Sequence, residues 1–329
     1  MKLRSTIAFL LIAVAVCAEE LPRKTKSPRE SYPNVDVIYD SVTTPHGERL
    51  RTIITKPRNA KGKLPVIFVA GWLSCDSVEA PADTKDASGL VFRGLAQVQD
   101  FSLFRALKNY DFIDSNRVYI LGISNGGGFA PLIPELDAEQ AQVRGYISVG
   151  GWAKTWFEHM LEIERRRFTL MGKAPSEVTD RMKNAATLYY EWLINGRAVD
   201  AILKEQPQLE ELWPEGKDHA HLYGRPLAFY EQLQKLNIAA AWSRVKVSTY
   251  ALRGAYDWIM SPEDAGLIAT YVNTNRQLAF SYEVPQMGHT FQHYLSFADA
   301  FKGKSAPFDP KVTGLLVDWL RHEAITRED

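Results

Sequence analysis

The chain has 329 residues, of which 46% are hydrophobic, and its 39 basic residues balance its 39 acidic residues. This length and composition fit one large α/β domain or two smaller ones and exclude an intrinsically disordered chain. A formal net charge of zero gives no electrostatic basis for binding nucleic acid or an anionic membrane. We therefore expect a globular protein with an ordinary hydrophobic core.

The first 18 residues are expected to be a secretory signal peptide. Two basic residues precede the apolar run at 7–16, and the small residue Ala18 supplies a cleavage site. The run is too short to span a bilayer, which takes ~20 residues. Cleavage after Ala18 predicts a secreted or periplasmic protein. A lipoprotein processed at Cys17 is the alternative, and the bulk of Val16 just before that cysteine argues against it.

Short apolar segments bounded by glycine, proline or charged residues follow in chain order and predict β-strands. The first two, at 36–42 and 50–55, flank a turn with Pro45 and Gly47 and therefore predict a hairpin. The remaining segments lie at 65–70, 118–122, 145–149, 245–252 and 278–284. Helical patterns separate most of these segments. Strands that alternate with helices indicate an α/β fold, with a mostly parallel sheet covered by helices on both faces.

Residues 152–244 show helical patterns only, and they predict a helical cap inserted between two strands of the sheet. The core would then consist of residues 19–151 and 245–329. At the start of the cap, Thr155 and Glu158 have the spacing of a capping box. Tryptophans in or beside the cap predict either an apolar binding pocket or the cap's own core. They are Trp152, Trp156, Trp192, Trp213 and Trp242.

A serine lies in a tight turn between a predicted strand and a predicted helix. It is Ser124, in the segment GISNG at 122–126. Such a turn lifts a hydroxyl out of the strand, and glycines on both sides let neighbouring chains approach closely. A serine hydroxyl is a weak nucleophile until a base takes its proton. A nucleophilic role for Ser124 therefore requires an acid and a histidine elsewhere in the chain.

Asp257 and His289 are the candidates for these two roles. Each follows the end of a predicted strand, and open α/β sheets keep their sites at the carboxyl ends of strands. Asp264 is better explained as a first-turn acid of the helix that opens at Ser261, where it complements the helix dipole. His293 is the close rival of His289.

Negative charge on a reacting oxygen would be stabilised by two backbone N–H groups. Asn125, directly after the serine, supplies one candidate donor. The loop after the strand at 65–70 is the expected source of the other, with Trp72 as the first candidate and Leu73 as the second.

With these segments in place, the sequence resembles the α/β-hydrolase-fold serine hydrolases. The segments RVYILGISNGGG, LRGAYDWIMSPEDA and VPQMGHTF are similar to that family's nucleophile, acid and histidine segments, in the same order. The resemblance extends from about Asp36 to the C-terminal helix. It implies that Ser124 attacks a carbonyl of a small-molecule ester or short peptide while His289 takes its proton and Asp257 orients His289. This chemistry needs no metal ion and no organic cofactor.

One interval departs from the family pattern. Gly71 and Ser124 are only 53 positions apart. In the family this interval holds a helix, a further parallel strand and another helix, whereas residues 83–114 show two helical runs. We therefore expect one sheet strand to be missing between Gly71 and Ser124. The segment 50–55 would then pair directly with the segment 65–70, or the sheet would have an open edge there.

Three functions remain open at this point. The first is a secreted hydrolase of carboxylic esters. The second is a serine peptidase similar to proline iminopeptidases, in which Glu158, Glu162 or Glu177 of the cap would bind a free α-amino group. The third, suggested by the short interval, is a binding protein with the same fold and no catalytic activity.

Overall fold

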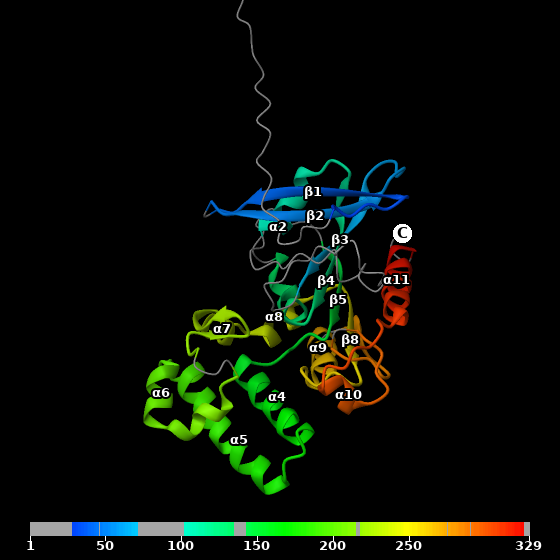
Figure 1. Cartoon of the computed structure of the whole chain (residues 1–329). Helices are drawn as coiled ribbons and strands as arrows, with labels where there is room; N and C mark the ends of the chain where they lie inside the picture. The colour runs from blue at the N-terminus through cyan, green and yellow to red at the C-terminus, as the bar shows by residue number, and fades with distance from the viewer. Residues whose placement is uncertain are drawn as a thin grey trace, which may run out of the picture.

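The structure, a computed structural model, describes residues 28–45, 47–71, 102–134, 143–214, 218–274, 276–289 and 291–325. Its centre is a five-stranded parallel sheet with the strand order β3-β4-β5-β8-β9 (Figure 1). The strands are β3 (Leu64–Ala70), β4 (Ile113–Ile123), β5 (Val143–Val149), β8 (Ser248–Gly254) and β9 (Ala279–Val284). The prediction of an α/β fold with a mostly parallel sheet is confirmed.

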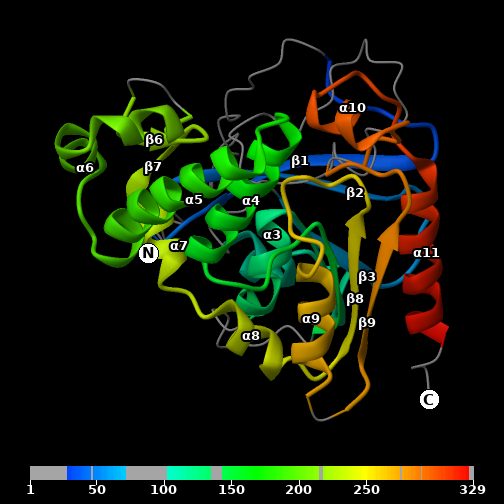
Figure 2. The same ribbon diagram turned by 90° about the horizontal axis from the view of Figure 1, so that it is seen from below.

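The residues of β4 alternate between the two faces of the sheet, and this alternation divides the hydrophobic core. Ile120 packs into the larger cluster, which also contains Ile268 of α9 (Asp264–Val272). Tyr119 packs into the other cluster, against Trp319 of α11 (Pro310–Ile325), with ring centroids 6.3 Å apart. Figure 2 shows α9 and α11 on either side of β8 and β9. Because successive strand residues point to opposite faces, each face has its own helical cover.

The predicted hairpin is confirmed. Strands β1 (Val35–Thr43) and β2 (Arg49–Pro57) pair antiparallel, with Val42 opposite Leu50. Gly47 in the turn has φ +90°, a conformation that glycine adopts at no steric cost.

Within the described ranges, β3 is an edge strand of the central sheet, because its neighbour is β4 and β2 pairs with β1. The expected direct pairing of 50–55 with 65–70 is therefore wrong in this part of the chain, and the open edge is the arrangement present. Residues 72–101, which would hold the missing strand, lie outside the described residues. The absence of a strand from this interval stays a prediction.

Strand β4 begins at Ile113, five residues before the predicted segment 118–122. Residues 114–117 of this strand are polar and at least partly exposed, so they show no apolar pattern. Ile113 nevertheless pairs with Leu64 of β3. The run before it, predicted to be one helix, contains α2 (Ser102–Arg105) and a short 3₁₀ helix (Ala106–Asn109).

The sequence predicts helices only between β5 and β8, and this is wrong at two short strands. The helices predominate. They are α4 (Trp156–Leu170), α5 (Pro175–Tyr189), a π-helical turn (Tyr190–Ile194), α6 (Val199–Glu205), a 3₁₀ helix (Pro207–Leu212), α7 (Leu227–Gln234) and α8 (Ile238–Arg244). Two short strands, β6 (His221–Leu222) and β7 (Arg225–Pro226), pair between α6 and α7. Figure 1 shows α4 to α7 grouped on the opposite side of the molecule from β1 and β2.

Capping residues explain where two of these helices begin. The predicted capping box of α4 is present: the Thr155 hydroxyl accepts the N–H of Glu158, and the Glu158 carboxylate accepts the N–H of Thr155. The carboxamide oxygen of Asn237 accepts the N–H of Ala240 at 2.9 Å and opens α8. This cap separates α8 from α7, although the sequence between 225 and 242 has one continuous helical pattern.

The predicted signal peptide, residues 1–18, lies outside the described residues. No helix in the part of the chain that the structure describes combines the length and the apolar character that a membrane span requires.

Candidate active site

Ser124 occupies a strained turn between β4 and α3 (Asn125–Phe129). Its backbone has φ +55° and ψ −120°, and such a conformation in a residue other than glycine costs of order 1–3 kcal/mol. The N–H of Ser124 donates to the carbonyl oxygen of Val149 at 2.9 Å, which holds the turn against the end of β5. This turn presents the hydroxyl at the carboxyl edge of the sheet.

Both flanking glycines are required by close backbone contacts. A Cβ at position 122 would lie 2.3 Å from the carbonyl oxygen of Gly126, and one at position 126 would lie 2.1 Å from that of Ala70. Neither distance is possible between real atoms, so the GISNG spacing follows from the packing of α3 onto β3 and β4.

The structure brings Ser124, His289 and Asp257 together. The Ser124 hydroxyl oxygen lies 3.0 Å from Nε2 of His289, and Nδ1 of His289 lies 2.8 Å from the Oδ2 atom of Asp257. His289 follows β9 and Asp257 follows β8, so the carboxyl ends of three strands meet at one site. Because Nδ1–H donates to the carboxylate, Nε2 carries the lone pair that faces the serine hydroxyl.

Asp257 is fully buried and well supplied with hydrogen-bond donors. Its Oδ1 atom accepts the N–H groups of Ile259 and Met260 at 2.9 and 3.0 Å, which leaves Oδ2 for His289. Burial by itself raises the pKa of Asp257. The neighbouring His289 and the donated N–H of Met260 outweigh burial, so the pKa of this carboxyl stays below its ordinary value of 3.8. At neutral pH the carboxylate is therefore ionised and can stabilise a charged imidazole.

Two arginines that the sequence analysis did not select hold the loop of Asp257. Arg253, at the end of β8, donates to the carbonyl oxygen of Asp257 at 2.6 Å. Arg166 of α4 donates to the carbonyl oxygens of Trp258 and Ile259 at 2.8 and 2.6 Å. Arg253 is a charged residue within an otherwise apolar strand, and this pattern could have identified it from the sequence. No feature of the neighbouring sequence distinguishes Arg166.

The rival residues lie in other networks. Nδ1 of His293 is 3.4 Å from the Oδ2 atom of Asp309, away from the serine. Asp264 accepts the N–H groups of Ala153 and Ser261, each at 3.1 Å, and so lies at the start of its own helix as predicted.

Asn125 has a backbone N–H that is free to bind a ligand. As the first residue of α3 it has no acceptor within the helix. Its neighbours do have acceptors: Gly126 donates to Gly71 at 2.9 Å and Gly127 donates to Ser124 at 2.9 Å. Among the described residues, the Asn125 N–H is thus the one open donor in the first turn of α3 beside the serine hydroxyl. Trp72 and Leu73, the candidates for the second donor, lie outside the described residues.

The order and placement of these residues decide the fold. A serine follows strand β4 in a tight strand-to-helix turn, an acid follows β8 and a histidine follows β9, all at the carboxyl ends of strands of one parallel sheet. The chain has the α/β-hydrolase fold. In this fold, helices α4 to α8 lie in the segment inserted between β5 and β8.

Comparisons with known proteins give matches to solved structures only. No protein-family model and no curated protein matches the sequence. Est1E from Butyrivibrio proteoclasticus is similar at 12% identity, with 88% of this chain and 99% of that chain covered and a TM-score of 0.49. Acetyl xylan esterase 1 from Thermoanaerobacterium sp. is similar at 16% identity, with coverage of 85% and 87% and a TM-score of 0.43. An acylaminoacyl peptidase from Pyrococcus horikoshii is similar at 12% identity and a TM-score of 0.46; the match covers 83% of this chain and 40% of that one.

The close packing at Gly126 predicts a strongly destabilising substitution. Gly126→Ala should push α3 away from the end of β3 and lower the free energy of unfolding by about 1–3 kcal/mol or more. Gly266→Ala on α9 is the matched control, because a Cβ there meets nothing within 4 Å and alanine favours a helix by up to ~1 kcal/mol. Urea unfolding of both variants measures the difference. Equal stability of the two variants would contradict the close contact.

Asp264 predicts a pH dependence of stability in the hydrolase fold. Burial raises its pKa from the ordinary value of 3.8 to about 6. Because the folded pKa is the higher one, the stabilising contribution of this group is complete below pH 3.8 and is lost as the pH rises through about 6. The Asp264→Asn variant has no titratable group at this position, so its stability does not fall with the ionisation of residue 264. Its stability relative to wild type should therefore rise by at most ~3 kcal/mol between pH 4 and pH 7.

Urea unfolding of wild type and variant at both pH values tests this expectation. Asp299→Asn is the control of opposite sign, because the bond from Lys304 lowers the pKa of Asp299. That variant should lose stability relative to wild type as the pH rises. A stability difference for Asp264→Asn that is the same at both pH values would rule out the burial effect.

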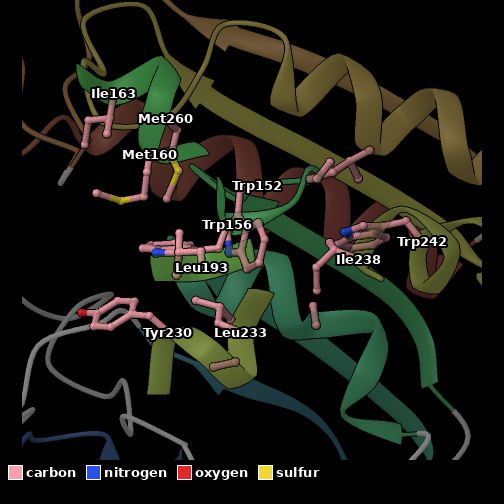
Figure 3. Close-up of a cluster of buried hydrophobic side chains, with 14 of the residues drawn as sticks. Trp152, Trp156, Met160, Ile163, Leu193, Tyr230, Leu233, Ile238, Trp242 and Met260 are labelled. Carbon is pink, nitrogen blue, oxygen red and sulfur yellow. The ribbon is translucent and has the colours of Figure 1, made fainter. Parts of the chain in front are cut away.

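The tryptophans between β5 and β8 form a hydrophobic core. All five are at most 4% exposed and belong to the larger cluster: Trp152, Trp156, Trp192, Trp213 and Trp242. Figure 3 shows Trp152 and Trp156 side by side, and their ring centroids are 5.6 Å apart. Met160 of α4 and Met260 of the loop that carries Asp257 belong to the same buried cluster (Figure 3). Of the two interpretations left open by the sequence, the structural core is the one these exposures support.

Proposed function

We propose that this protein is a serine hydrolase that cleaves carboxylic esters through an acyl-enzyme on Ser124. The observation that carries the proposal is the bridge by His289, whose ring nitrogens lie 3.0 Å from the Ser124 hydroxyl and 2.8 Å from the carboxylate of Asp257. A nucleophile, a base and an orienting acid within hydrogen-bond reach are what this chemistry requires.

In the proposed reaction, His289 takes the proton of Ser124 as the serine oxygen attacks the ester carbonyl. Asp257 stabilises the imidazolium that forms, and it does so without taking the proton. The Asn125 N–H stabilises the developing oxyanion, together with a second donor that we assign to Trp72. His289 then protonates the departing alcohol, and water hydrolyses the acyl-enzyme by the reverse sequence of proton transfers. No cofactor and no metal ion enters this scheme.

The contacts of the cap acids favour an ester over a peptide with a free amino terminus. Glu158 closes the capping box of α4, and Glu162 binds the ammonium group of Lys154 at 2.5 Å. Glu177 binds both Lys173 and Arg181, at 2.9 and 3.0 Å. Each of these three carboxylates already has a positive or N–H partner, although Oε2 of Glu162 has none in the described residues. A peptidase similar to proline iminopeptidases is therefore the second candidate.

The organisation of the chain is part of the proposal. We assign residues 152–244 as a cap that sets specificity, because Arg166 of this segment bonds the loop that carries Asp257. Residues 19–151 and 245–329 form the catalytic core. We assign residues 1–18 as a signal peptide, which makes the enzyme secreted or periplasmic.

A substrate panel with a serine-directed inhibitor tests the proposed function. The panel contains p-nitrophenyl esters of increasing acyl length and aminoacyl p-nitroanilides, including the prolyl derivative, each assayed with and without a fluorophosphonate. We expect ester hydrolysis that the fluorophosphonate abolishes and little turnover of the prolyl anilide. Faster turnover of the anilide would establish the peptidase. An absence of both turnover and labelling would establish the non-catalytic binding protein.

A further inference from the structure

The side chain of Asn125 is buried beside the nucleophile without any hydrogen-bond partner. The residue is only 3% exposed, and neither its carboxamide nitrogen nor its carboxamide oxygen bonds another group in the described residues. Buried carboxamides are normally paired, because leaving one unpaired forfeits its hydrogen bonds to water. Asn125 directly follows Ser124 in the chain, so its unpaired group lies within a few bond lengths of the reacting centre.

Among the described residues, further buried polar groups without partners lie on Trp152 and on α4; three of them are uncharged, and the fourth, Oε2 of Glu162, belongs to the carboxylate that pairs with Lys154. The indole nitrogen of Trp152 lies against Gly128 of α3, close enough that a Cβ there would be 2.2 Å from it. Trp152 contacts Trp156, and the Trp156 ring lies against the His159 ring at an interplanar angle of 37°, with ring centroids 4.6 Å apart. Both indole nitrogens and Nδ1 of His159 lack hydrogen-bond partners in the described part of the chain. Unpaired polar groups thus extend from Trp152, beside α3, to His159 of α4.

His159 is neutral at physiological pH. Burial is the main cause that lowers its pKa, to about 3, and the positive charge of Arg166 acts in the same direction. His289 and Asp257 also influence this pKa, which places the imidazole of His159 within electrostatic reach of the candidate active site. The unpaired groups of Asn125, Trp152, Trp156 and His159 therefore offer hydrogen bonds without carrying charge themselves, and burying an unpaired charged group against them would be costly.

We propose that the carboxamide of Asn125 binds an uncharged amide on the acyl chain of the substrate, close to the scissile carbonyl. The inference rests on the proposed ester hydrolysis and names its substrate class, which is esters whose acyl group is an N-acylated amino acid. The amide of an N-acylated amino acid has one N–H donor and one carbonyl acceptor, which can pair with the carboxamide oxygen and the NH2 group of Asn125, respectively. The position close to the carbonyl follows from the adjacency of Asn125 to Ser124.

Two methyl esters of equal chain length test the inference. Methyl N-acetylglycinate carries the amide, and methyl pentanoate has methylene groups in its place; a pH-stat measures kcat/KM for each. We expect wild type to prefer the amide ester by about tenfold or more, and Asn125→Leu to reduce that preference by roughly 10- to 100-fold. The backbone N–H is unchanged in this variant, and any effect common to both esters cancels in the ratio.

Thermal unfolding provides a second readout that a structural role for Asn125 would not reproduce. Because the carboxamide of Asn125 has no partner to lose, Asn125→Leu should keep or raise the melting temperature. Asn273→Leu is the matched control, since the carboxamide of Asn273 bonds Leu278 and Ala279. That variant should melt at a lower temperature and keep the wild-type preference between the esters.

The outcomes separate this inference from the proposed function. Turnover of both esters with the same preference in wild type and Asn125→Leu would overturn the inference and leave the hydrolase in place. A lowered melting temperature in Asn125→Leu would also overturn it, because the carboxamide would then have a structural partner. If neither ester is hydrolysed and a fluorophosphonate does not label Ser124, the proposed function itself fails.

Discussion

Ser124→Ala is expected to lower kcat/KM for ester hydrolysis by about 10⁴-fold or more. The substitution removes the oxygen that attacks the carbonyl and leaves His289 without the proton it takes, while the change in volume is a single atom. The remaining rate would come from binding and from the oxyanion donors alone. Hydrolysis of the best p-nitrophenyl ester measures the loss, and fluorophosphonate labelling followed by peptide mapping shows whether position 124 is the modified residue.

Ser148→Ala is the matched control for this experiment. Ser148 is a second buried serine close to the turn that carries Ser124, and its hydroxyl donates to the carbonyl oxygen of Gly127 at 3.3 Å. This variant should lose at most a few-fold in rate and should still be labelled by the fluorophosphonate. A Ser124→Ala protein that keeps more than a tenth of the wild-type rate would show that the nucleophile is another residue.

His289→Gln is expected to lower kcat/KM by about 10³-fold or more, while His293→Gln should change it by less than about threefold. The imidazole of His289 alone connects Ser124 to Asp257, and a glutamine cannot accept and return the serine proton. Ester hydrolysis between pH 5 and pH 9 compares the two variants. His293 bonds Asp309 instead, at 3.4 Å, so its loss removes no group that touches the proposed nucleophile.

The residual activity of His289→Gln also discriminates between mechanisms. In the proposed mechanism, the remaining hydrolysis should increase with hydroxide concentration, because no group in the site can remove the serine proton. A large loss in His293→Gln together with a small loss in His289→Gln would reverse the assignment. Circular dichroism of both variants controls for unfolding.

Local sequence was sufficient for the features that depend on neighbours in the chain. The GISNG turn around Ser124, the hairpin closed at Gly47 and the capping box at Thr155 each need only a few adjacent residues, and the structure contains all three. The alternation of apolar strands with helices likewise indicates a parallel sheet from the sequence alone. The order serine, acid, histidine along the chain was visible for the same reason, since each residue follows the end of a strand.

Long-range packing decided what the sequence left open. Asp257 and Asp264 are seven positions apart, and only the loop held by Arg253 and Arg166 determines that the first faces His289. The early start of β4 also depends on a partner, because Ile113 pairs with Leu64 of β3 and regular pairing resumes only at Val118, opposite Val66.

The choice of partners for buried polar groups belongs entirely to the tertiary structure. A sequence shows that Asn125 has a carboxamide beside the serine, but it contains no information on whether that carboxamide is paired. Pairing depends on atoms that distant segments bring to within about 3 Å, and the distribution of apolar residues along the chain does not record such distances. The sequence by itself therefore determined the class of fold and the nucleophilic turn. The folded chain decided which histidine and acid join Ser124, and which polar atoms beside it have no hydrogen-bond partner in the described residues.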